Sequence, residues 1–143
     1  MAKGQFRDVD ELRSVMDALF SLLAHDPTIG PALRDADVSQ RFEFTDHGAI
    51  LDVAPAAPDA DAALRWEWGG TAPWQPAVTM RMRSDVANKF WQGKLNPLLA
   101  VAMGKIQTTG DVRRAASLAP VLQPAHARYR ELLGARGLDH LLV

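Results

Sequence analysis

The apolar residues change their spacing twice along this chain of 143 residues, and no other feature constrains the fold as strongly. Between residues 41 and 83, apolar and polar residues alternate, which is the pattern of half-buried β-strands. Before and after that block, apolar residues recur at every third or fourth position, which is the pattern of amphipathic helices. Because the strands follow one another without intervening helices, the sequence predicts an α+β domain and argues against a doubly wound sheet.

Two helices are predicted before the strands. Asp26-Pro27 ends the first helix, since a residue that precedes proline is pushed out of the α region. A second, shorter helix is predicted within residues 28–37. A single apolar stripe runs along the first helix, residues 8–24, and is formed by Leu12, Met16, Leu19 and Leu23.

Strands are predicted in the alternating block at residues 41–45, 49–54, 64–68 and 78–83. Each strand has one apolar and one polar face, so we expect one face of the sheet to be covered by helices and the other to be exposed to water. A fifth strand is predicted at residues 105–109, after the spacing has returned to that of helices.

The helical pattern resumes after the fourth strand, with helices predicted at residues 84–93, 97–103, 112–118 and 125–133. The hydroxyl of Ser84 is expected to accept a hydrogen bond from a free backbone N–H at the start of the first of these. Asn96-Pro97 is a start signal for the second, because asparagine caps a helix and proline fits the first helical position. Pro120 and Pro124 are expected to break the pattern before the last helical segment.

The composition limits the classes of function. The chain has 16 basic and 17 acidic residues, whereas nucleic-acid-binding domains usually have a basic excess. It has no cysteine, which excludes disulfides, thiolate nucleophiles and cysteine-ligated zinc. The longest apolar run, residues 18–24, is far shorter than the roughly 18 residues of a membrane span. We therefore expect a soluble, cytoplasmic protein in which a helical segment, residues 1–37, packs on a domain of residues 38–143.

Few residues are suited to catalysis. The four histidines are dispersed and lack the spacing of helical metal ligands. No serine lies in a Gly-x-Ser-x-Gly motif, and no glycine-rich loop has the lysine that binds phosphate. Asp46-His47 and Glu43 remain as acid–base candidates, but Asp46-His47 is expected in a hairpin turn and Glu43 on the exposed face of a strand. The sequence therefore predicts no catalytic residue, no metal site and no cofactor.

Bulky apolar residues gather on one predicted face in the second half of the chain. Methionine and tryptophan suit the wall of a pocket that accepts variable apolar shapes. The same residues also fill close-packed cores, which composition alone favours. The face comprises Trp66, Trp68, Met80, Met82, Phe90, Trp91, Leu95, Leu98, Leu99, Met103 and Ile106.

Residues 92–111 contain several short motifs in a fixed order. Gly93-Lys94, Asn96-Pro97, an apolar helix, Gly104-Lys105, a short strand and Gly110-Asp111 follow one another without a gap. This segment resembles the signature of sterol carrier protein 2 domains, and the preceding strands are in that family's order. The resemblance covers roughly residues 38–124. Its glycines end helices and Asn-Pro starts one, so the motifs specify a fold.

The resemblance implies a five-stranded, largely antiparallel sheet with one face covered by helices, and an apolar tunnel between the two. Members of the family bind sterols, fatty acids, acyl-CoA or phospholipid. Thr108 replaces a usual aliphatic residue, and Met103 stands where eukaryotic members often have glutamine. Residues 140–143 lack the peroxisomal tripeptide of eukaryotic carriers. The resemblance is to a stand-alone bacterial member of the family. We expect the tunnel to be lined by Trp66, Trp68, Met80, Met82, Phe90, Trp91, Leu99 and Met103.

Three functions are compatible with these features. The first is non-catalytic binding or transfer of a sterol, fatty acid, acyl-CoA or other lipid, with no nucleic-acid partner and no stable insertion into membranes. The second is a dimerisation or accessory module of a larger enzyme system, in which helix 8–24 packs its stripe on a second copy. The third is an enzyme that acts on a hydrophobic substrate. For the first, Leu99 and Met103 should both face the tunnel, so that Met103→Gln would bury an unpaired amide and destabilise the protein.

Overall fold

Two helices precede four strands, and further helices lie before and after a fifth strand, in the computed structural model, which describes residues 3–143. The elements are, in chain order, α1 (Val9–His25), α2 (Ile29–Ala36), β1 (Gln40–Phe44), β2 (Ala49–Pro55), β3 (Leu64–Trp68), β4 (Val78–Met82), α3 (Ser84–Trp91), α4 (Pro97–Ala102), β5 (Gln107–Gly110), α5 (Val112–Ala116), α6 (Ala119–Ala135) and a final 3₁₀ turn, η1 (Asp139–Leu141). The predicted α+β class and the five predicted strands are confirmed.

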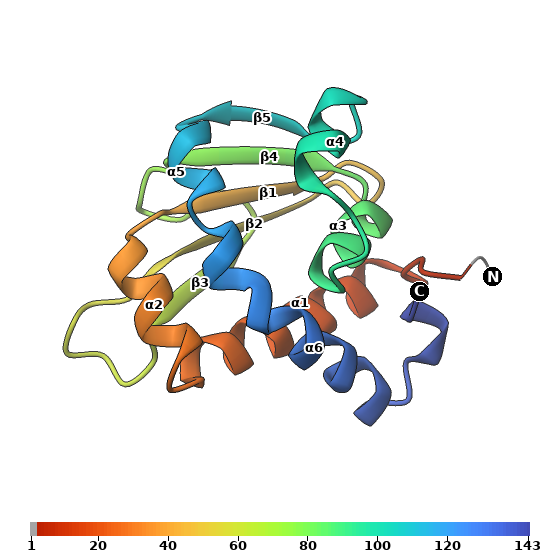
Figure 1. Ribbon diagram of the computed structural model, residues 1–143, viewed down its shortest axis with the longest axis horizontal. Helices are drawn as coiled ribbons and strands as arrows, with labels where there is room; N and C mark the ends of the chain where they lie inside the picture. Colours follow the sequence, from red (N-terminus) through yellow and green to blue (C-terminus); the bar gives the residue numbers. More distant parts are fainter. Residues whose placement is uncertain (1–2) are drawn as a thin grey trace.

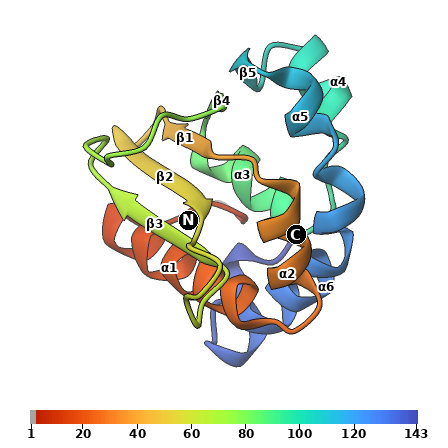
Figure 2. The same ribbon diagram turned by 90° about the vertical axis from the view of Figure 1, so that its left-hand side faces the viewer.

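The five strands form one sheet in the order β3-β2-β1-β4-β5 (Figure 1). Three neighbouring pairs are antiparallel, whereas β1 and β4 are parallel, with Phe42 opposite Met80. The parallel pair arises because β2 and β3 lie on one side of β1, so the chain returns across the sheet before β4 begins. The helices gather on one face of this sheet (Figure 2). The prediction of a largely antiparallel sheet with one face covered by helices is confirmed.

The covered face of the sheet packs on α1. The four residues of the predicted α1 stripe are fully buried, in one core with strand residues such as Phe44 and Leu51. Phe20 extends this core, with its ring centroid 6.1 Å from that of Phe42 and 5.6 Å from that of Trp91. The hypothesis that α1 packs its stripe on a second copy is therefore wrong, because the chain's own sheet and helices already cover it.

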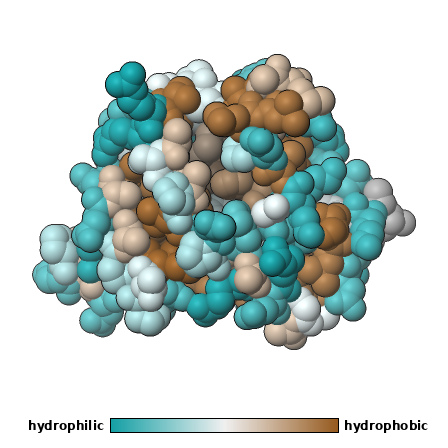
Figure 3. Space-filling model, in the orientation of Figure 1, coloured by the Kyte–Doolittle hydropathy of each residue, from teal (hydrophilic) through white to brown (hydrophobic). Residues whose placement is uncertain are grey.

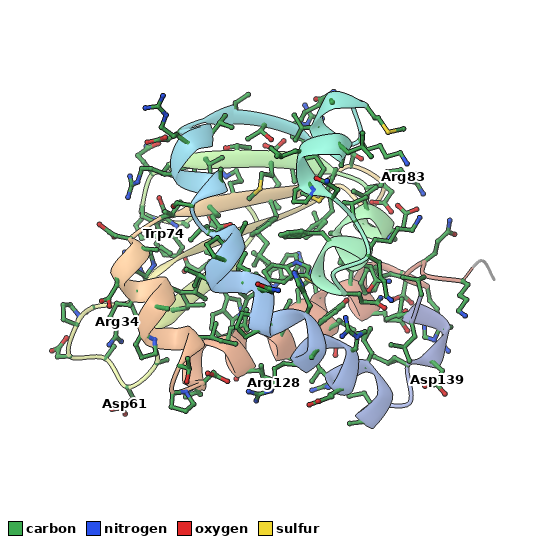
Figure 4. All side chains as sticks on the ribbon, in the orientation of Figure 1. Arg34, Asp61, Trp74, Arg83, Arg128 and Asp139 are labelled. Atoms are coloured by element: carbon green, nitrogen blue, oxygen red, sulfur yellow. The ribbon has the colours of Figure 1, made fainter. Side chains whose placement is uncertain are left out.

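The opposite face of the sheet is not simply exposed to water. Asp52 is fully buried there, and Arg41 donates to its two carboxylate oxygens over 2.8 and 3.1 Å. Arg41 also donates to the carbonyl of Gly70, in the β3–β4 connection that carries Trp74 (Figure 4). The Trp74 ring in turn lies 4.4 Å from the guanidinium of Arg65. The predicted exposure to water fails at Asp52, where a paired and hydrogen-bonded carboxylate can be buried.

A buried polar network joins α3 to both ends of the described chain. Asn88, Gln92 and Tyr129 are all fully buried. The Tyr129 hydroxyl donates to Asn88 Oδ1 over 2.7 Å, and burial raises the pKa of Tyr129 well above its usual range, so the hydroxyl stays a donor. The amides of Asn88 and Gln92 both donate to the carbonyl of Leu141, and Asn88 also donates to that of Gly4. These mutual hydrogen bonds make the buried amides tolerable.

α6 is longer than the sequence predicted. It is one helix from Ala119 to Ala135, so the predicted break at Pro120 and Pro124 is wrong. Pro120 lies in the first turn, where its missing N–H would have had no helical partner. Pro124 removes one hydrogen bond inside the helix. Burial of Leu122 and Tyr129 on the same helix offsets that loss.

Two carboxylates hold the starts of helices. Asp26 accepts from the N–H of Ile29 over 2.8 Å and also pairs with Arg128 of α6 (Figure 4). Its backbone donors, together with Arg128, hold the pKa of Asp26 below its usual value. Asp46 accepts from the N–H of Ser84 over 2.8 Å and from its hydroxyl over 2.7 Å. The predicted capping by the Ser84 hydroxyl is therefore wrong, because that hydroxyl donates to Asp46, which caps α3.

We predict that Asp46→Ala lowers the free energy of unfolding by about 1 kcal/mol at neutral pH, because α3 loses its cap. Burial alone would raise the pKa of Asp46, but the hydrogen bonds from Ser84 lower it below its usual value. A carboxyl whose pKa is lower in the folded state stabilises above its unfolded pKa and loses that effect as the pH falls through its folded pKa. The difference in the free energy of unfolding between wild type and Asp46→Ala should therefore shrink below about pH 4.

Urea denaturation at a series of pH values measures this difference. Asp59→Ala is the matched control, since Asp59 is exposed in the β2–β3 connection. A difference between wild type and Asp46→Ala that stays constant down to about pH 2 would show that the ionised carboxylate is not the cap.

Candidate functional site

An apolar cavity of about 210 Å³ lies between the sheet and the helices α3 to α6. This volume is far larger than the roughly 15 Å³ that one water molecule needs. Figure 3 shows a hollow bordered by apolar surface on the corresponding face of the molecule. Gln40 and Thr108 contribute the polar side chains of a lining that otherwise consists of Phe42, Met80, Met82, Ala87, Phe90, Trp91, Pro97, Leu98, Val101, Ile106, Val112, Ala115, Ala116, Leu118, Ala119 and Leu122.

The wall opposite the sheet is thin, because two short helices form it. Asn96 Oδ1 accepts from the N–H of Leu98 over 3.0 Å, and Pro97 occupies the first position of α4, so the predicted start signal is confirmed. α4 buries only Ala100, and α5 buries no residue. Most apolar side chains of both helices therefore lie at the cavity or at the surface.

Gly110 fixes the place where β5 ends and α5 begins. Its φ is 95°, and a Cβ there would lie 2.4 Å from the carbonyl oxygen of Ala77 in the neighbouring chain segment. Asp111 then donates its N–H to the same carbonyl over 2.8 Å, while its carboxylate accepts from the N–H of Arg114 and caps α5. The close approach of two backbones thus sets the position of α5 over the cavity.

We predict that Gly110→Ala destabilises the fold by about 2 kcal/mol or more, since it combines a strained positive φ with an overlap of backbone atoms. Gly104→Ala is the matched control, because Gly104 also has a positive φ, 76°, but has open space around its Cβ position. Melting temperature and urea midpoint measure both variants. Equal losses of stability in Gly110→Ala and Gly104→Ala would mean that the contact with Ala77 does not hold α5 in place.

Four of the eight residues predicted to line the tunnel lie around the cavity. Met80 and Met82 of β4 and Phe90 and Trp91 of α3 all contribute to its wall. Trp91 is buried, so its ring is held in place on the core side and presented to the cavity on the other. Their role in ligand binding stays a prediction.

The prediction that Trp66 and Trp68 line the cavity is wrong. Both indole N–H groups donate to Asp17 Oδ1 on α1, over 3.1 and 2.8 Å. The Trp66 ring packs near Phe20 and the Trp68 ring near Phe44, each at 6.2 Å. Both tryptophans face the covered side of the sheet, as their alternation predicted, but α1 covers that end of the sheet and the cavity lies at the other end.

Leu99 and Met103 also lie outside the cavity wall, contrary to prediction. Their exposed fractions are 57% and 61%. α4 turns Leu98 and Val101 toward the cavity instead. The expected destabilisation by Met103→Gln therefore has no basis, because an exposed amide finds water as its partner.

Sequence reasoning missed part of the lining. Phe42 and Thr108 both stand opposite Met80 in the sheet register, so strand alternation contained the signal that would have found them. Leu118 and Leu122 flank the predicted helix break at Pro120, and no local pattern pointed them toward a cavity.

The acid–base candidates lie away from the cavity. Asp46 caps α3, and His47 follows it in the β1–β2 turn with its Nε2 3.6 Å from the Asp46 carboxylate. Glu43 pairs with Arg81 over 3.1 Å on the opposite face of the sheet. Within residues 3–143, no three side chains of the metal-binding types come together. Over the same residues, no helix is long and apolar enough to cross a membrane.

No family model and no curated protein sequence matches the chain. Solved structures do match it. The ubiquinone synthesis protein UbiJ-SCP2 matches with a TM-score of 0.57 and 14% identity, over 80% of this chain and 94% of that one. Apo sterol carrier protein 2 from Yarrowia lipolytica matches with a TM-score of 0.56 and 17% identity, over 79% and 91%. The chain has the fold of sterol carrier protein 2 domains.

The same fold also occurs as one part of a larger protein. The stereoselective inverting sec-alkylsulfatase Pisa1 from Pseudomonas sp. matches with a TM-score of 0.57 and 19% identity, over 71% of this chain. The chain spans only 15% of the length of that sulfatase. At such identities the similarity concerns the fold, and function has to be argued from the cavity.

Proposed function

We propose that the protein binds a hydrophobic ligand in the cavity and carries it without catalysis. The observation behind this proposal is a cavity of about 210 Å³ whose lining is apolar except for Gln40 and Thr108. The fold of sterol carrier protein 2 domains supports it. The ligand classes that fit are a sterol, a fatty acid, an acyl-CoA or another lipid.

The chemistry of the lining determines how such a ligand lies. An apolar chain or ring placed there loses no hydrogen-bond partner, whereas a polar headgroup would meet only Gln40 and Thr108. The apolar part should therefore lie inside, with the headgroup at the mouth. Each buried methylene stabilises the complex by about 0.8 kcal/mol. Micromolar affinity corresponds to about −8 kcal/mol and association costs about 4 kcal/mol or more, so roughly fifteen buried methylenes are needed.

We predict that Met80→Trp, which enlarges a residue of the wall, weakens binding of palmitate and of cholesterol at least tenfold. Met103→Trp is the matched control, because the same change is made at an exposed position outside the cavity. Isothermal titration calorimetry gives the affinities. At the same ligand concentration, the melting temperature should rise more for wild type and for Met103→Trp than for Met80→Trp.

Trp91 offers an independent readout, since its ring lines the cavity. Its fluorescence should change in a saturable way as palmitate or cholesterol is added. The proposal fails if neither lipid changes the fluorescence or the melting temperature of the wild type and neither gives a heat of binding. It also fails if Met80→Trp and Met103→Trp bind the two lipids equally well.

A second candidate is an accessory or dimerisation module of a larger enzyme system. The observation that favours it is the match to a segment that makes up 15% of the sec-alkylsulfatase chain. The α1 stripe is already buried, so an assembly would use another surface. A stable dimer by light scattering, together with no lipid binding, would support this candidate over the first.

A further inference from the structure

α4 places several large apolar side chains at the surface. We define the α4 patch as Leu98, Leu99, Val101 and Met103. Leu98 is 78% exposed and Val101 42%, and Leu99 and Met103 lie between these values. Within residues 3–143, the other exposed large apolar side chains are Val112 and Val143. A cluster of this kind on one short helix is unusual for a surface that meets only water.

The α4 patch is continuous with the mouth of the cavity. Leu98 and Val101 are exposed and also line the cavity. Val112 at the start of α5 shares both properties. Figure 3 shows apolar surface beside the hollow on this face of the molecule. Whatever covers the α4 patch therefore also lies against the opening through which a ligand would pass.

Positive charge borders the α4 patch. Residues 86–130 contain seven lysines and arginines but one acidic residue, Asp111, although the whole chain has a net charge of −1. Lys94 and Lys105, both exposed, stand three residues from either end of α4. The carboxylate of Asp111 is engaged in capping α5. Asp85, which borders the same groove as Lys105, is paired with an arginine side chain 3.1 Å away.

We propose that the α4 patch docks on the surface of a lipid bilayer that contains anionic lipids. Leucine and methionine side chains enter the boundary between headgroups and acyl chains, while Lys94 and Lys105 contact anionic headgroups. This inference rests on the proposed function, and it explains how a lipid would pass from a bilayer into the cavity without crossing water.

Charge argues against a second copy as the occupant. A two-fold dimer places the same surface of both copies face to face. Lys94 and Lys105 of one copy would then lie near those of the other, and like charges across an interface disfavour association. An anionic surface complements the same lysines.

Vesicle sedimentation with the full chain tests the docking surface. Phosphatidylcholine vesicles with about one third phosphatidylglycerol should bind the wild type at least tenfold more tightly than vesicles of phosphatidylcholine alone. Raising the salt from about 0.1 M to about 0.5 M should weaken binding, because it screens the lysines. Lys94→Glu with Lys105→Glu should abolish the preference for anionic vesicles, whereas Arg136→Glu, an exposed change at the far end of α6, should not.

The double variant Leu99→Ser with Met103→Ser separates docking from ligand binding. Neither residue lines the cavity, so palmitate should bind as in wild type. Binding to anionic vesicles should fall about tenfold or more, because the apolar contacts with the bilayer are lost.

Three results would overturn the proposal. The first is equal binding of wild type to neutral and anionic vesicles. The second is vesicle binding that the Leu99→Ser and Met103→Ser changes leave intact. The third is a wild-type dimer in light scattering that these changes convert to a monomer, which would make a second copy the occupant. If the wild type binds anionic vesicles but does not bind palmitate, the proposed cavity function is refuted and the docking surface is supported.

Discussion

The buried hydrogen bonds among Asn88, Gln92 and Tyr129 are the contact on which the rest of the structure depends. They hold one side of α3 against the carbonyl of Leu141, while the other side of the helix presents Trp91 to the cavity. An apolar cavity tends to close, because its lining atoms lack contacts across the void. If α3 moved onto the sheet to fill the cavity, buried amides would lose their partners at about 1–3 kcal/mol each. Closing the cavity by such a movement therefore carries a cost in buried hydrogen bonds.

Packing is distributed unevenly around that network. α1 buries seven residues against the sheet and its neighbouring helices, whereas α4 buries only Ala100 and α5 buries none. Local opening is easiest where few apolar contacts are broken, so α4 and α5 should open at a lower free energy than the core. Under the proposed function, a ligand would thus enter past these two helices while α1 and the sheet stay folded. The position of the cavity at the weakly packed end of the molecule is consistent with reversible uptake of a ligand.

The sequence predicted the elements and the fold better than the cavity, for identifiable physical reasons. Periodicity shows which face of a strand is apolar, but not which helix covers that face. By alternation alone Trp66 and Met80 are equivalent, although α1 covers Trp66 and the cavity lies against Met80. In the short and apolar α4, spacing places Leu99 and Met103 on one face but does not show which way that face points, and the prediction that it faces the tunnel is wrong. Capping of α3 by Asp46 also lay beyond local patterns, because the two partners are 38 residues apart.

Two aromatic rings connect the core to the cavity. Phe42 and Trp91 line the cavity, their centroids are 6.5 Å apart, and Phe20 from α1 supports both from the core side. The floor of the cavity is consequently part of the buried core, while its outer wall is two short helices. A ligand in contact with these rings stabilises the cooperative unit that contains α1 and the sheet. At a free ligand concentration of about 100 times Kd, that stabilisation is about 2.7 kcal/mol of the global unfolding free energy. Under the proposed function, binding would thus be linked to the stability of the whole domain, whereas uptake and release would depend on local opening at α4 and α5.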